Sequence, residues 1–328
     1  LGKTRPFSSS RLVAPPRGCA FSNRAAIAGM NHLLVLVLLA AWAALAHARW
    51  TVLVYQVADN DLECFGMEDI DEMLRARMRA GGQEEDLTVF TMVDRAGGQY
   101  GNWCKGEVGG MPRWNTARDL LVRKDGKLEQ LADHGEVDMG RPEVLEAFIR
   151  RGLAAYPADN YMLVLWNHGN GWPGFGGDLN YAGAAGGYYV APSMLSVPEM
   201  RSAIDSALKA SSVEAFDLLG FDACLMNSYV VLGTLAPLAR YILASEELEP
   251  GHGWDYSFLA ALNPPLGQPP GPVQAGKAIS DLFLRQAAEQ STDTITLALV
   301  EGGAAFAAFE AKVTALAGVL AAALDGDV

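Results

Sequence analysis

Apolar runs alternate along the chain with segments of helical periodicity. The apolar runs are continuous and rich in β-branched and aromatic residues, which is typical of buried strands. They lie at residues 50–57, 87–93, 161–166, 216–221, 241–244 and 294–300. Helices are predicted at residues 67–78, 142–156, 197–210, 226–238, 273–289 and 304–324. Because strands that are apolar throughout must be covered on both faces, this order predicts an α/β protein with a mostly parallel central sheet.

Two residues with reactive side chains directly follow predicted strands. His168 comes after the strand at residues 161–166, and Cys224 comes after the strand at residues 216–221. Sites in parallel sheets lie at the carboxyl ends of the strands. Imidazole is well suited to act as a base near neutral pH, and a cysteine becomes a nucleophile as the thiolate. The pair therefore predicts nucleophilic catalysis, with Cys224 as nucleophile and His168 as general base.

Each of these residues also has an ordinary structural interpretation. A histidine after a strand can be a hydrogen-bonded loop residue, and a free cysteine is more often a small buried hydrophobic residue. The catalytic interpretation gains support from the helix predicted close behind Cys224, because a helix N-terminus lowers the pKa of a thiol. His134 lies in a polar stretch and is interpreted as a surface residue.

The N-terminal residues differ from the rest of the chain. Residues 30–48 comprise a methionine, an apolar run of about 13 residues and a small-x-small ending, which together predict a signal peptide. The apolar run is shorter than the ~20 residues that span a bilayer, so no stable membrane span is expected. Residues 1–29 are interpreted as upstream sequence outside the fold. The protein is therefore predicted to be secreted into the extracellular space.

The cysteine count agrees with an oxidising compartment. Beyond residue 48 the chain has three cysteines, so at least one of them is unpaired within the chain. Cys64 and Cys104 could form a disulfide, although the sequence does not show that they approach each other. That pairing would leave Cys224 as a free thiol.

Acidic residues outnumber basic ones by 38 to 25. The excess is larger beyond residue 48, because the first 48 residues hold five basic side chains and no acidic one. The remaining 20 basic and 38 acidic groups give a net charge of −18. Such a surface repels phosphate, which argues against nucleic-acid partners, and it attracts cationic substrates.

Four segments together resemble one protein family. They are residues 50–63 (WTVLVYQVADNDLE), 161–172 (YMLVLWNHGNGW), 216–227 (FDLLGFDACLMN) and 244–256 (ASEELEPGHGWDY). Their order and spacing are similar to those of the clostripain-like cysteine peptidases, family C11 of the caspase, legumain and gingipain clan. The resemblance implies a caspase-like three-layer α/β/α sandwich and a His168–Cys224 dyad. It also implies oxyanion donors at the backbone N–H groups of Gly169 and Cys224.

The resemblance further implies polypeptide substrates that are cleaved after Arg or Lys. A basic P1 side chain needs a carboxylate at the base of its pocket. Asp222, two residues before Cys224, matches the family motif for this role, and its structural alternative is to cap the following helix. A second acid is expected after the next strand. The acids there are Glu246, Glu247, Glu249 and Asp255, of which Asp255 is our candidate. His252 stands where relatives carry an acid, which leaves the choice between Arg and Lys open.

No metal ligands are assigned and no organic cofactor is expected. Calcium is kept as a possible cofactor, because calcium dependence occurs in the type member of the resembled family. Two acidic groups could supply hard oxygen ligands. They are Asp59-Asn60-Asp61 with Glu63, and Glu68-Asp69-Asp71-Glu72. A solvated acidic face is the simpler explanation, because neither group matches an EF-hand loop.

These observations divide the chain into four parts. Residues 1–29 are upstream sequence, 30–48 a signal peptide, 49–263 a peptidase domain, and 264–328 a Pro/Gly linker followed by a helical and strand continuation of that domain. The protein is expected to be a monomer. Two alternative functions are a catalytically inactive or regulatory protein of the same fold, and an extracellular binding module that uses the Gly- and Tyr-rich loop at residues 174–190. A serine hydrolase is disfavoured because no G-x-S-x-G motif occurs.

The loop after His168 has an unusual composition, because residues 152–200 contain no Lys or Arg. Many members of the resembled family are activated by self-cleavage after a basic residue in this loop. We therefore expect the protein to be active with residues 171–200 uncut. Mass spectrometry of purified, active protein should find this segment intact. Activity that arises only after a cut within it would contradict the single-chain form.

Overall fold

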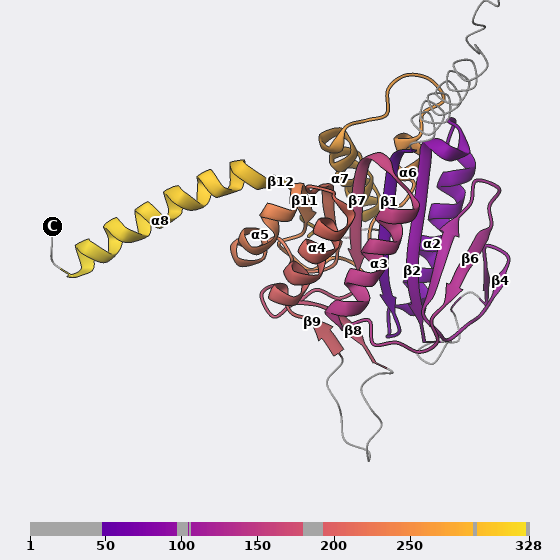
Figure 1. Cartoon of the computed structure of the whole chain (residues 1–328), viewed down its shortest axis with the longest axis horizontal. Helices are drawn as coiled ribbons and strands as arrows, with labels where there is room; N and C mark the ends of the chain where they lie inside the picture. The colour runs from indigo at the N-terminus through magenta and orange to yellow at the C-terminus, as the bar shows by residue number, and fades with distance from the viewer. Residues whose placement is uncertain (1–47, 97–103, 105, 180–192, 291–293, 326–328) are drawn as a thin grey trace, which may run out of the picture. The chain divides into compact units, whose positions relative to one another are not determined.

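The computed structural model describes residues 48–96, 104, 106–179, 193–290 and 294–325, which are built around one eight-stranded sheet (Figure 1). In chain order the strands are β1 (Ala48–Ala58), β2 (Leu87–Arg95), β5 (Arg118–Val122), β6 (Leu128–Asp133), β7 (Ala158–Trp166), β10 (Phe216–Asp222), β11 (Ala239–Ala244) and β12 (Ala298–Glu301). Their spatial order is β12-β11-β10-β7-β1-β2-β5-β6. The five central strands run parallel, and β12, β5 and β6 extend the two edges in antiparallel pairing.

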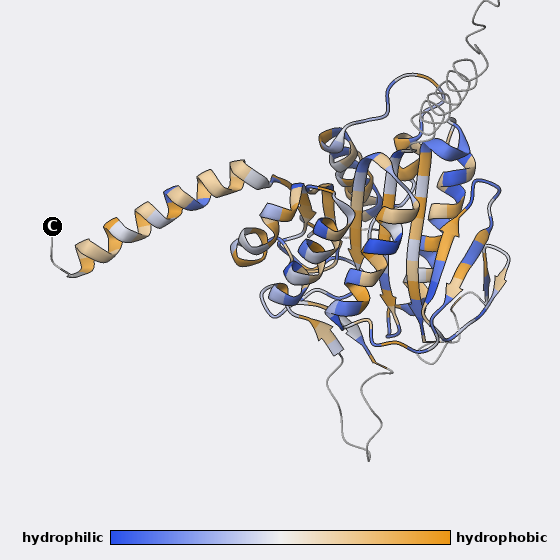
Figure 2. Ribbon diagram, viewed as in Figure 1, coloured by the Kyte–Doolittle hydropathy of each residue, from blue (hydrophilic) through white to orange (hydrophobic). Residues whose placement is uncertain are grey.

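Helices cover both faces of the sheet. On one face lie α3 (Pro142–Ala155), α4 (Val197–Ser211) and α5 (Tyr229–Leu235), and on the other lie α2 (Glu63–Arg79), α6 (Phe258–Leu262) and α7 (Pro272–Glu289). Alternate residues of each strand point to opposite faces, so Tyr55 and Val57 enter one hydrophobic core while Val52 and Val54 enter the other. The central strands are accordingly coloured as apolar over much of their length (Figure 2). This is a three-layer α/β/α sandwich, and it confirms the predicted fold class.

The six predicted strands are all present, and the structure adds β5 and β6. These two form a hairpin around Asp125 and Gly126, with Gly126 at a φ of +80° that favours glycine. β5 is mostly buried and β6 is mostly exposed, as expected where the sheet ends. Two further pairs are short: β3 (Glu107–Val108) with β4 (Met111–Pro112), and β8 (Phe175–Asp178) with β9 (Ser193–Leu195). The predicted signal peptide and most of the Gly- and Tyr-rich loop lie outside the described residues.

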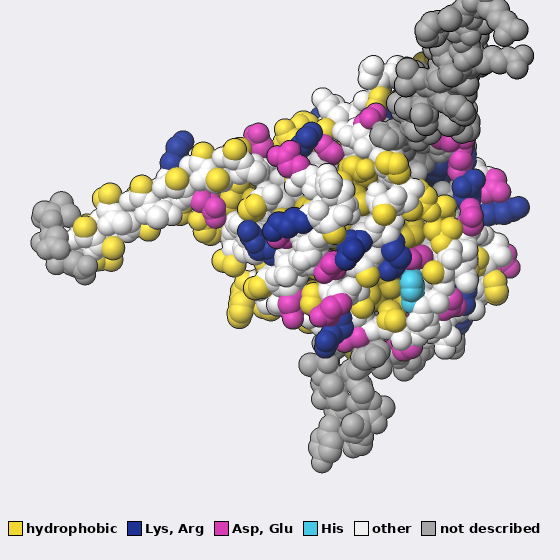
Figure 3. Space-filling model, viewed as in Figure 1, with side chains coloured by type: hydrophobic (Ala, Val, Ile, Leu, Met, Phe, Trp, Pro, Cys, Tyr) yellow, Lys and Arg dark blue, Asp and Glu magenta, His cyan; other side chains and the backbone are white. Residues whose placement is uncertain are grey.

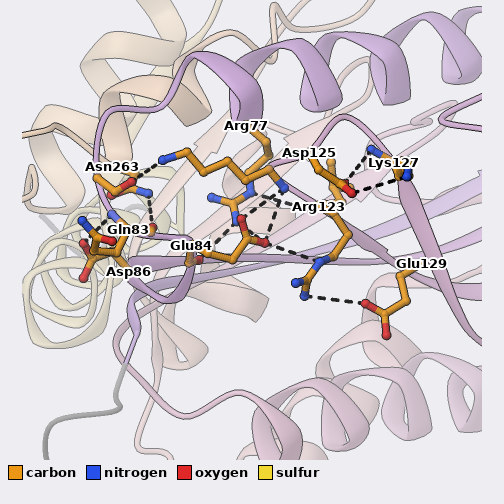
Figure 4. A network of polar contacts seen from close by, with 12 residues as sticks. Arg77, Gln83, Glu84, Asp86, Arg123, Asp125, Lys127, Glu129 and Asn263 are labelled. Atoms are coloured by element: carbon orange, nitrogen blue, oxygen red, sulfur yellow. Dashed lines mark hydrogen bonds and ion pairs between the residues drawn. The ribbon is translucent and has the colours of Figure 1, made fainter.

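Glu84 connects the end of α2 to the β5–β6 hairpin (Figure 4). Its carboxylate lies 3.2 Å from the guanidinium of Arg77 and 3.5 Å from that of Arg123. It also accepts a hydrogen bond from the N–H of Lys124. Arg77 is almost fully buried and donates to the carbonyl of Val122, so its charge is compensated within the protein. The network holds the outer hairpin against the helix that covers it.

A disulfide and a buried ion pair hold the start of α2. Cys64, in the first turn of this helix, forms a disulfide with Cys104. Beside it, Glu63 accepts a hydrogen bond of 2.6 Å from Arg95, the last residue of β2, and both side chains are fully buried. The guanidinium of Arg95 also lies over the ring of Trp114, 5.0 Å from its centroid. Together these contacts fix the helix start to the carboxyl end of the sheet.

The last helix, α8 (Gly303–Asp325), is apolar and largely exposed (Figure 3). Its segment Gly303–Leu324 is long and apolar enough to cross a membrane, and its most apolar stretch is not buried. The large exposed side chains on it are Phe309, Leu316, Val319, Leu320 and Leu324. Length and composition are shared by membrane spans and by helices that pack against other protein, so they assign no role to α8.

Removing the Cys64–Cys104 disulfide should destabilise the fold by about 4 kcal/mol, because the bond cross-links residues 40 positions apart in the unfolded chain. The Cys64→Ser/Cys104→Ser double variant should unfold at a lower urea concentration than the parent, as measured by tryptophan fluorescence. The parent in strong reductant is the matched control and should unfold at the midpoint of the variant. Equal midpoints for the variant and the oxidised parent would contradict this role of the disulfide.

Candidate active site

The strand order brings two distant segments to one edge of the sheet. β7 and β10 are parallel neighbours, and in their register Trp166 lies opposite Asp222. The residues that follow the two strands therefore leave the sheet side by side. The N–H of Asn167 donates to the carbonyl of Asp222 at 3.3 Å, which continues the pairing one step beyond β7. His168 and Cys224 are the next polar residues on the two segments, as the sequence predicts.

Cys224 lies in the loop between β10 and α5. Its thiol is half-buried and contacts the backbone of Glu249, whose N–H donates to Sγ at 3.2 Å. The N–H of Leu225 donates to the carbonyl of Glu247 at 3.1 Å. The loop after β11 is therefore hydrogen-bonded to the cysteine loop, and Glu249 lies beside the sulfur.

The helix behind Cys224 begins later than the sequence predicts. α5 starts at Tyr229, and the hydroxyl of Ser228 caps it by accepting a hydrogen bond from Val231. The prediction that Cys224 is at a helix N-terminus is therefore wrong, and so is the alternative that Asp222 caps this helix. Leu225, with a φ of +64°, turns the chain before the helix can start.

His168 is held by polar contacts with the end of β1. Its Nε2 lies 3.0 Å from the carboxylate of Asp61, and the neighbouring Asn167 donates to the carbonyl of Val57 at 2.7 Å. Both partners of the His168–Asp61 pair are well exposed, 43% and 69%, so this contact orients the ring more than it stabilises the fold. In the described part of the structure His168 and Cys224 occupy adjacent strand ends without a hydrogen bond between their side chains.

Two backbone N–H groups beside Cys224 have no acceptor within the described residues. They belong to Gly169 and to Cys224 itself. Gly169 is packed so closely on the carbonyl of Cys224 that a Cβ atom at this position would overlap it. The absence of a side chain thus lets the two loops touch. The role of these two N–H groups as oxyanion donors stays a prediction.

A small pocket opens beside the sulfur of Cys224. It is lined by Trp166, Asn167, Asp222, Ala223, Cys224, Glu249, Pro250, Gly251 and Gly253. Two carboxyl groups therefore face the same space as the thiol, Asp222 from the strand end and Glu249 from the loop after β11.

Asp222 is a buried carboxylate with a fixed orientation. It accepts a hydrogen bond of 2.9 Å from the hydroxyl of Tyr256 and one of 3.1 Å from the N–H of Trp254. Burial raises the pKa of Asp222 to about 7, although these two hydrogen bonds act in the opposite direction. Burial and the neighbouring Asp222 also raise the pKa of Glu249 well above its ordinary value. The pocket is therefore a place where a cation would relieve the cost of two buried acids.

The structure does not bring Asp255 into this pocket. Its carboxylate accepts a hydrogen bond from the N–H of Ser257 at 2.8 Å, within its own loop. His252 does not line the pocket either, and its Nδ1 lies 2.8 Å from the carbonyl of Gly253. The second acid of the pocket is Glu249, which the sequence pattern alone does not distinguish from Glu246 and Glu247.

The acidic residues at the start of α2 are engaged separately. Asp69 accepts a hydrogen bond of 2.6 Å from the indole of Trp166, and Glu72 accepts one of 3.0 Å from the N–H of Tyr256. Burial raises the pKa of Asp69, and the charge of Asp222 raises it further. These acids lie behind the pocket and support its walls rather than forming one ligand cluster.

Comparisons with known proteins give a consistent result. A family profile described as the clostripain family matches residues 54–323. Clostripain from Hathewaya histolytica is 30% identical over 233 residues, which is 63% of this chain and 40% of that protein. The chain thus spans well under half the length of this curated relative.

Solved structures of low sequence identity share the fold. One is a secreted C11 cysteine protease from Bacteroides thetaiotaomicron in complex with an irreversible peptide inhibitor, with a TM-score of 0.56 and 24% identity over 74% of this chain and 60% of that one. Another is an inactive zymogen C11 protease from Parabacteroides distasonis, with a TM-score of 0.55 and 20% identity over 78% of this chain and 62% of that one. At such identities the likeness supports the fold alone.

Proposed function

The chain belongs to the clostripain family, and from this premise we propose that it is a secreted cysteine endopeptidase that cleaves peptide bonds after basic residues. The observation that carries the proposal is the meeting of His168, the free thiol of Cys224 and two pocket acids at one edge of the sheet. Secretion is supported by the predicted signal peptide, by the Cys64–Cys104 disulfide and by relatives described as secreted.

The proposed reaction proceeds through an acyl-enzyme. His168 accepts the proton of the Cys224 thiol, and the thiolate attacks the carbonyl carbon of the scissile bond. The negative charge that develops on the carbonyl oxygen is stabilised by the N–H groups of Gly169 and Cys224. His168 then returns its proton to the leaving amine as the C–N bond breaks. A water molecule, deprotonated by His168, attacks the thioester and releases the new carboxylate and the thiol.

Asp61 is proposed as the residue that orients His168. Because the carboxylate contacts Nε2, the proton transfer with Cys224 would use Nδ1. An oriented imidazole loses less freedom on reaching the transition state. Asp61 and His168 are both exposed, so their contact contributes little electrostatic free energy. We therefore expect Asp61 to affect turnover less than His168 or Cys224 does.

The pocket acids support the proposed preference for Arg or Lys at P1. A cation in the pocket would face Asp222 at the strand end and Glu249 on the opposite loop. The pocket is small, so we propose that the segment 250–253 moves outward to admit a long side chain. Two glycines in that segment, Gly251 and Gly253, make such a movement sterically undemanding.

We expect the secreted form to hydrolyse peptides with Arg or Lys at P1, and Cys224→Ala to lower kcat/KM by about 10⁴-fold or more, because the nucleophile is lost. Fluorogenic peptides that differ only at P1 (Arg, Lys or Asp) measure both effects. Equal rates for the variant and the parent would contradict the peptidase and leave an inactive or binding protein of this fold. Cleavage after Asp but not after Arg or Lys would keep the mechanism and contradict the pocket assignment.

The pH dependence of P1 selection should follow the ionisation of Asp222. A cationic P1 group needs this carboxylate ionised, and its pKa is about 7, so binding should weaken as the pH falls through 7. The ratio of kcat/KM for an Arg-P1 peptide to that for the uncharged citrulline-P1 analogue isolates this effect, because titration of the dyad cancels. The ratio should fall below pH 7 in the parent.

In Asp222→Asn the same ratio should be at least about 30-fold lower, because the buried charge partner is gone, and any pH dependence that is left would come from Glu249. Glu249→Gln should also lower the ratio, whereas Asp255→Asn, the matched acid outside the pocket, should leave it unchanged. A ratio that does not vary with pH in the parent, or that falls only in Asp255→Asn, would contradict the assignment of the pocket.

A further inference from the structure

The chain that follows His168 forms a tight hairpin turn, and Trp172 lies at its tip. Two backbone hydrogen bonds cross this turn. The N–H of Gly176 donates to the carbonyl of His168 at 3.0 Å, and the N–H of Asn170 donates to the carbonyl of Gly174 at 3.0 Å. The turn therefore presents Trp172 on an ordered backbone, a few residues from the proposed general base.

The side chain of Trp172 is 74% exposed, whereas the other tryptophans among the described residues are at most 4% exposed. These others are Trp50, Trp114, Trp166 and Trp254. An exposed indole leaves a large apolar area in water, and tryptophan is enriched among the residues that contribute most to binding. Single exposed apolar residues are ordinary on protein surfaces, so the position of Trp172 decides what its exposure means.

The turn is packed on the loop that carries the nucleophile. Gly171, the residue before Trp172, is buried, and a Cβ atom there would lie 3.3 Å from the carbonyl oxygen of Leu225. Leu225 directly follows Cys224 and has a φ of +64°, a left-handed conformation that leucine rarely adopts. Backbone strain of this kind occurs preferentially at functional sites. Trp172 is therefore one residue removed from a close contact with the residue after the nucleophile.

The side of the site on which Trp172 lies follows from the roles proposed above. The pocket for the P1 side chain is lined from residues 166–167, 222–224 and the segment 249–253, and none of residues 168–176 lines it. His168 returns its proton to the leaving amine, which is the nitrogen of P1′, the first residue after the scissile bond. P1′ must therefore lie against His168. The turn that follows His168 borders the path of the residues after the scissile bond.

We propose that Trp172 is a substrate-binding residue that contacts P1′ or P2′, the first two residues after the scissile bond, and favours apolar or aromatic side chains there. The indole offers a flat apolar face on which an aromatic ring stacks and an aliphatic chain is removed from water. Because the turn already orders its backbone, little freedom is lost on binding. The inference rests on the proposed peptidase function and adds a preference on the side of the scissile bond opposite the acidic P1 pocket.

The test compares two peptides that share Arg at P1 and all residues before it, and that carry either Phe or Gly at both P1′ and P2′. The ratio of kcat/KM for the Phe peptide to that for the Gly peptide measures the preference, because binding at P1 cancels. The ratio should be at least about 10 in the parent, since a partly buried aromatic ring is stabilised to that extent. It should fall at least about fivefold in Trp172→Ala and stay near the parental value in Trp172→Phe. Leu266→Ala is the matched control: Leu266 is an 88% exposed apolar residue between α6 and α7, and its loss should leave the ratio unchanged.

A second measurement isolates the side of the site after the scissile bond. An ester substrate with Arg at P1 forms the acyl-enzyme and releases its alcohol, which empties that side. Added phenylalaninamide or glycinamide then competes with water: the amine attacks the thioester, a peptide bond forms, and the proton of the amine passes to the Cys224 thiolate. Phenylalaninamide should capture at least about five times more acyl-enzyme than glycinamide in the parent, and Trp172→Ala should abolish this difference. A variant that merely disturbed His168 would lower the capture of both amines and keep the difference.

Cleavage of both peptides by the parent at equal rates would overturn the inference and leave the proposed function intact. A preference that survives in Trp172→Ala, or one that is lost in Leu266→Ala, would overturn it as well. Cleavage of neither peptide would overturn the proposed function and this inference with it. Because Trp172 is exposed, Trp172→Ala should melt close to the parent. If it fails to fold, Trp172→Gln carries the same expectation, and the ratio in the parent still decides the question.

Discussion

The parallel pairing of β7 with β10 is the constraint on which the rest of the site depends. Two residues separated by more than fifty positions in sequence, His168 and Cys224, can meet only if both strands end at the same edge in the same register. The pairing is secured by fully buried side chains on both strands, and it continues through the Asn167–Asp222 backbone contact. A shift of the register by one residue would move all of the strand's side chains to the opposite face and separate the two loops. Core packing and site geometry are therefore set by the same hydrogen bonds.

Several acidic side chains are buried at the carboxyl edge of the sheet, where a negative charge costs free energy. Asp222 and Glu249 face the pocket, Asp69 lies behind it, and Asp94 lies near the end of β2; burial raises the pKa of all four. Folded proteins rarely bury acids without compensation, because a charge loses its hydration when it leaves water. Under the proposed preference for basic P1 residues, the cation that faces Asp222 and Glu249 is brought by the substrate.

The sequence predicts the layers well and places His168 and Cys224 after strands of the sheet, because both features follow from long continuous apolar strands. The fully buried strands β1, β7 and β10 cannot be mistaken for surface elements, and the residues after them are placed by a general rule of parallel sheets. The β5–β6 hairpin is missed, although Asp125-Gly126 between two short strands is a recognised turn signal.

Other features depend on distances that no local pattern encodes. α5 starts later than the sequence predicts because Leu225 adopts a left-handed conformation. Leucine rarely does so, and nothing in the local sequence indicates it. Asp61 could have been suspected, since a polar turn after a central strand must lie near His168, whereas the choice of Glu249 over its neighbours rests on tertiary structure alone.

The disulfide at the start of α2 places two opposite chemical demands on one molecule. Cys64 and Cys104 are joined in a disulfide and almost inaccessible, 3% and 6% exposed, whereas Cys224 is a half-buried free thiol that must stay reduced for the proposed catalysis. Buried structural disulfides resist the thiol concentrations that reverse the oxidation of an exposed cysteine to a sulfenic acid or mixed disulfide. Under the proposed function, mild oxidants would therefore stop the activity of the protein, and small thiols would restore it without loss of the fold. In an extracellular setting its working state would follow the local supply of low-molecular-weight thiols, so that the redox condition of its surroundings would regulate it reversibly.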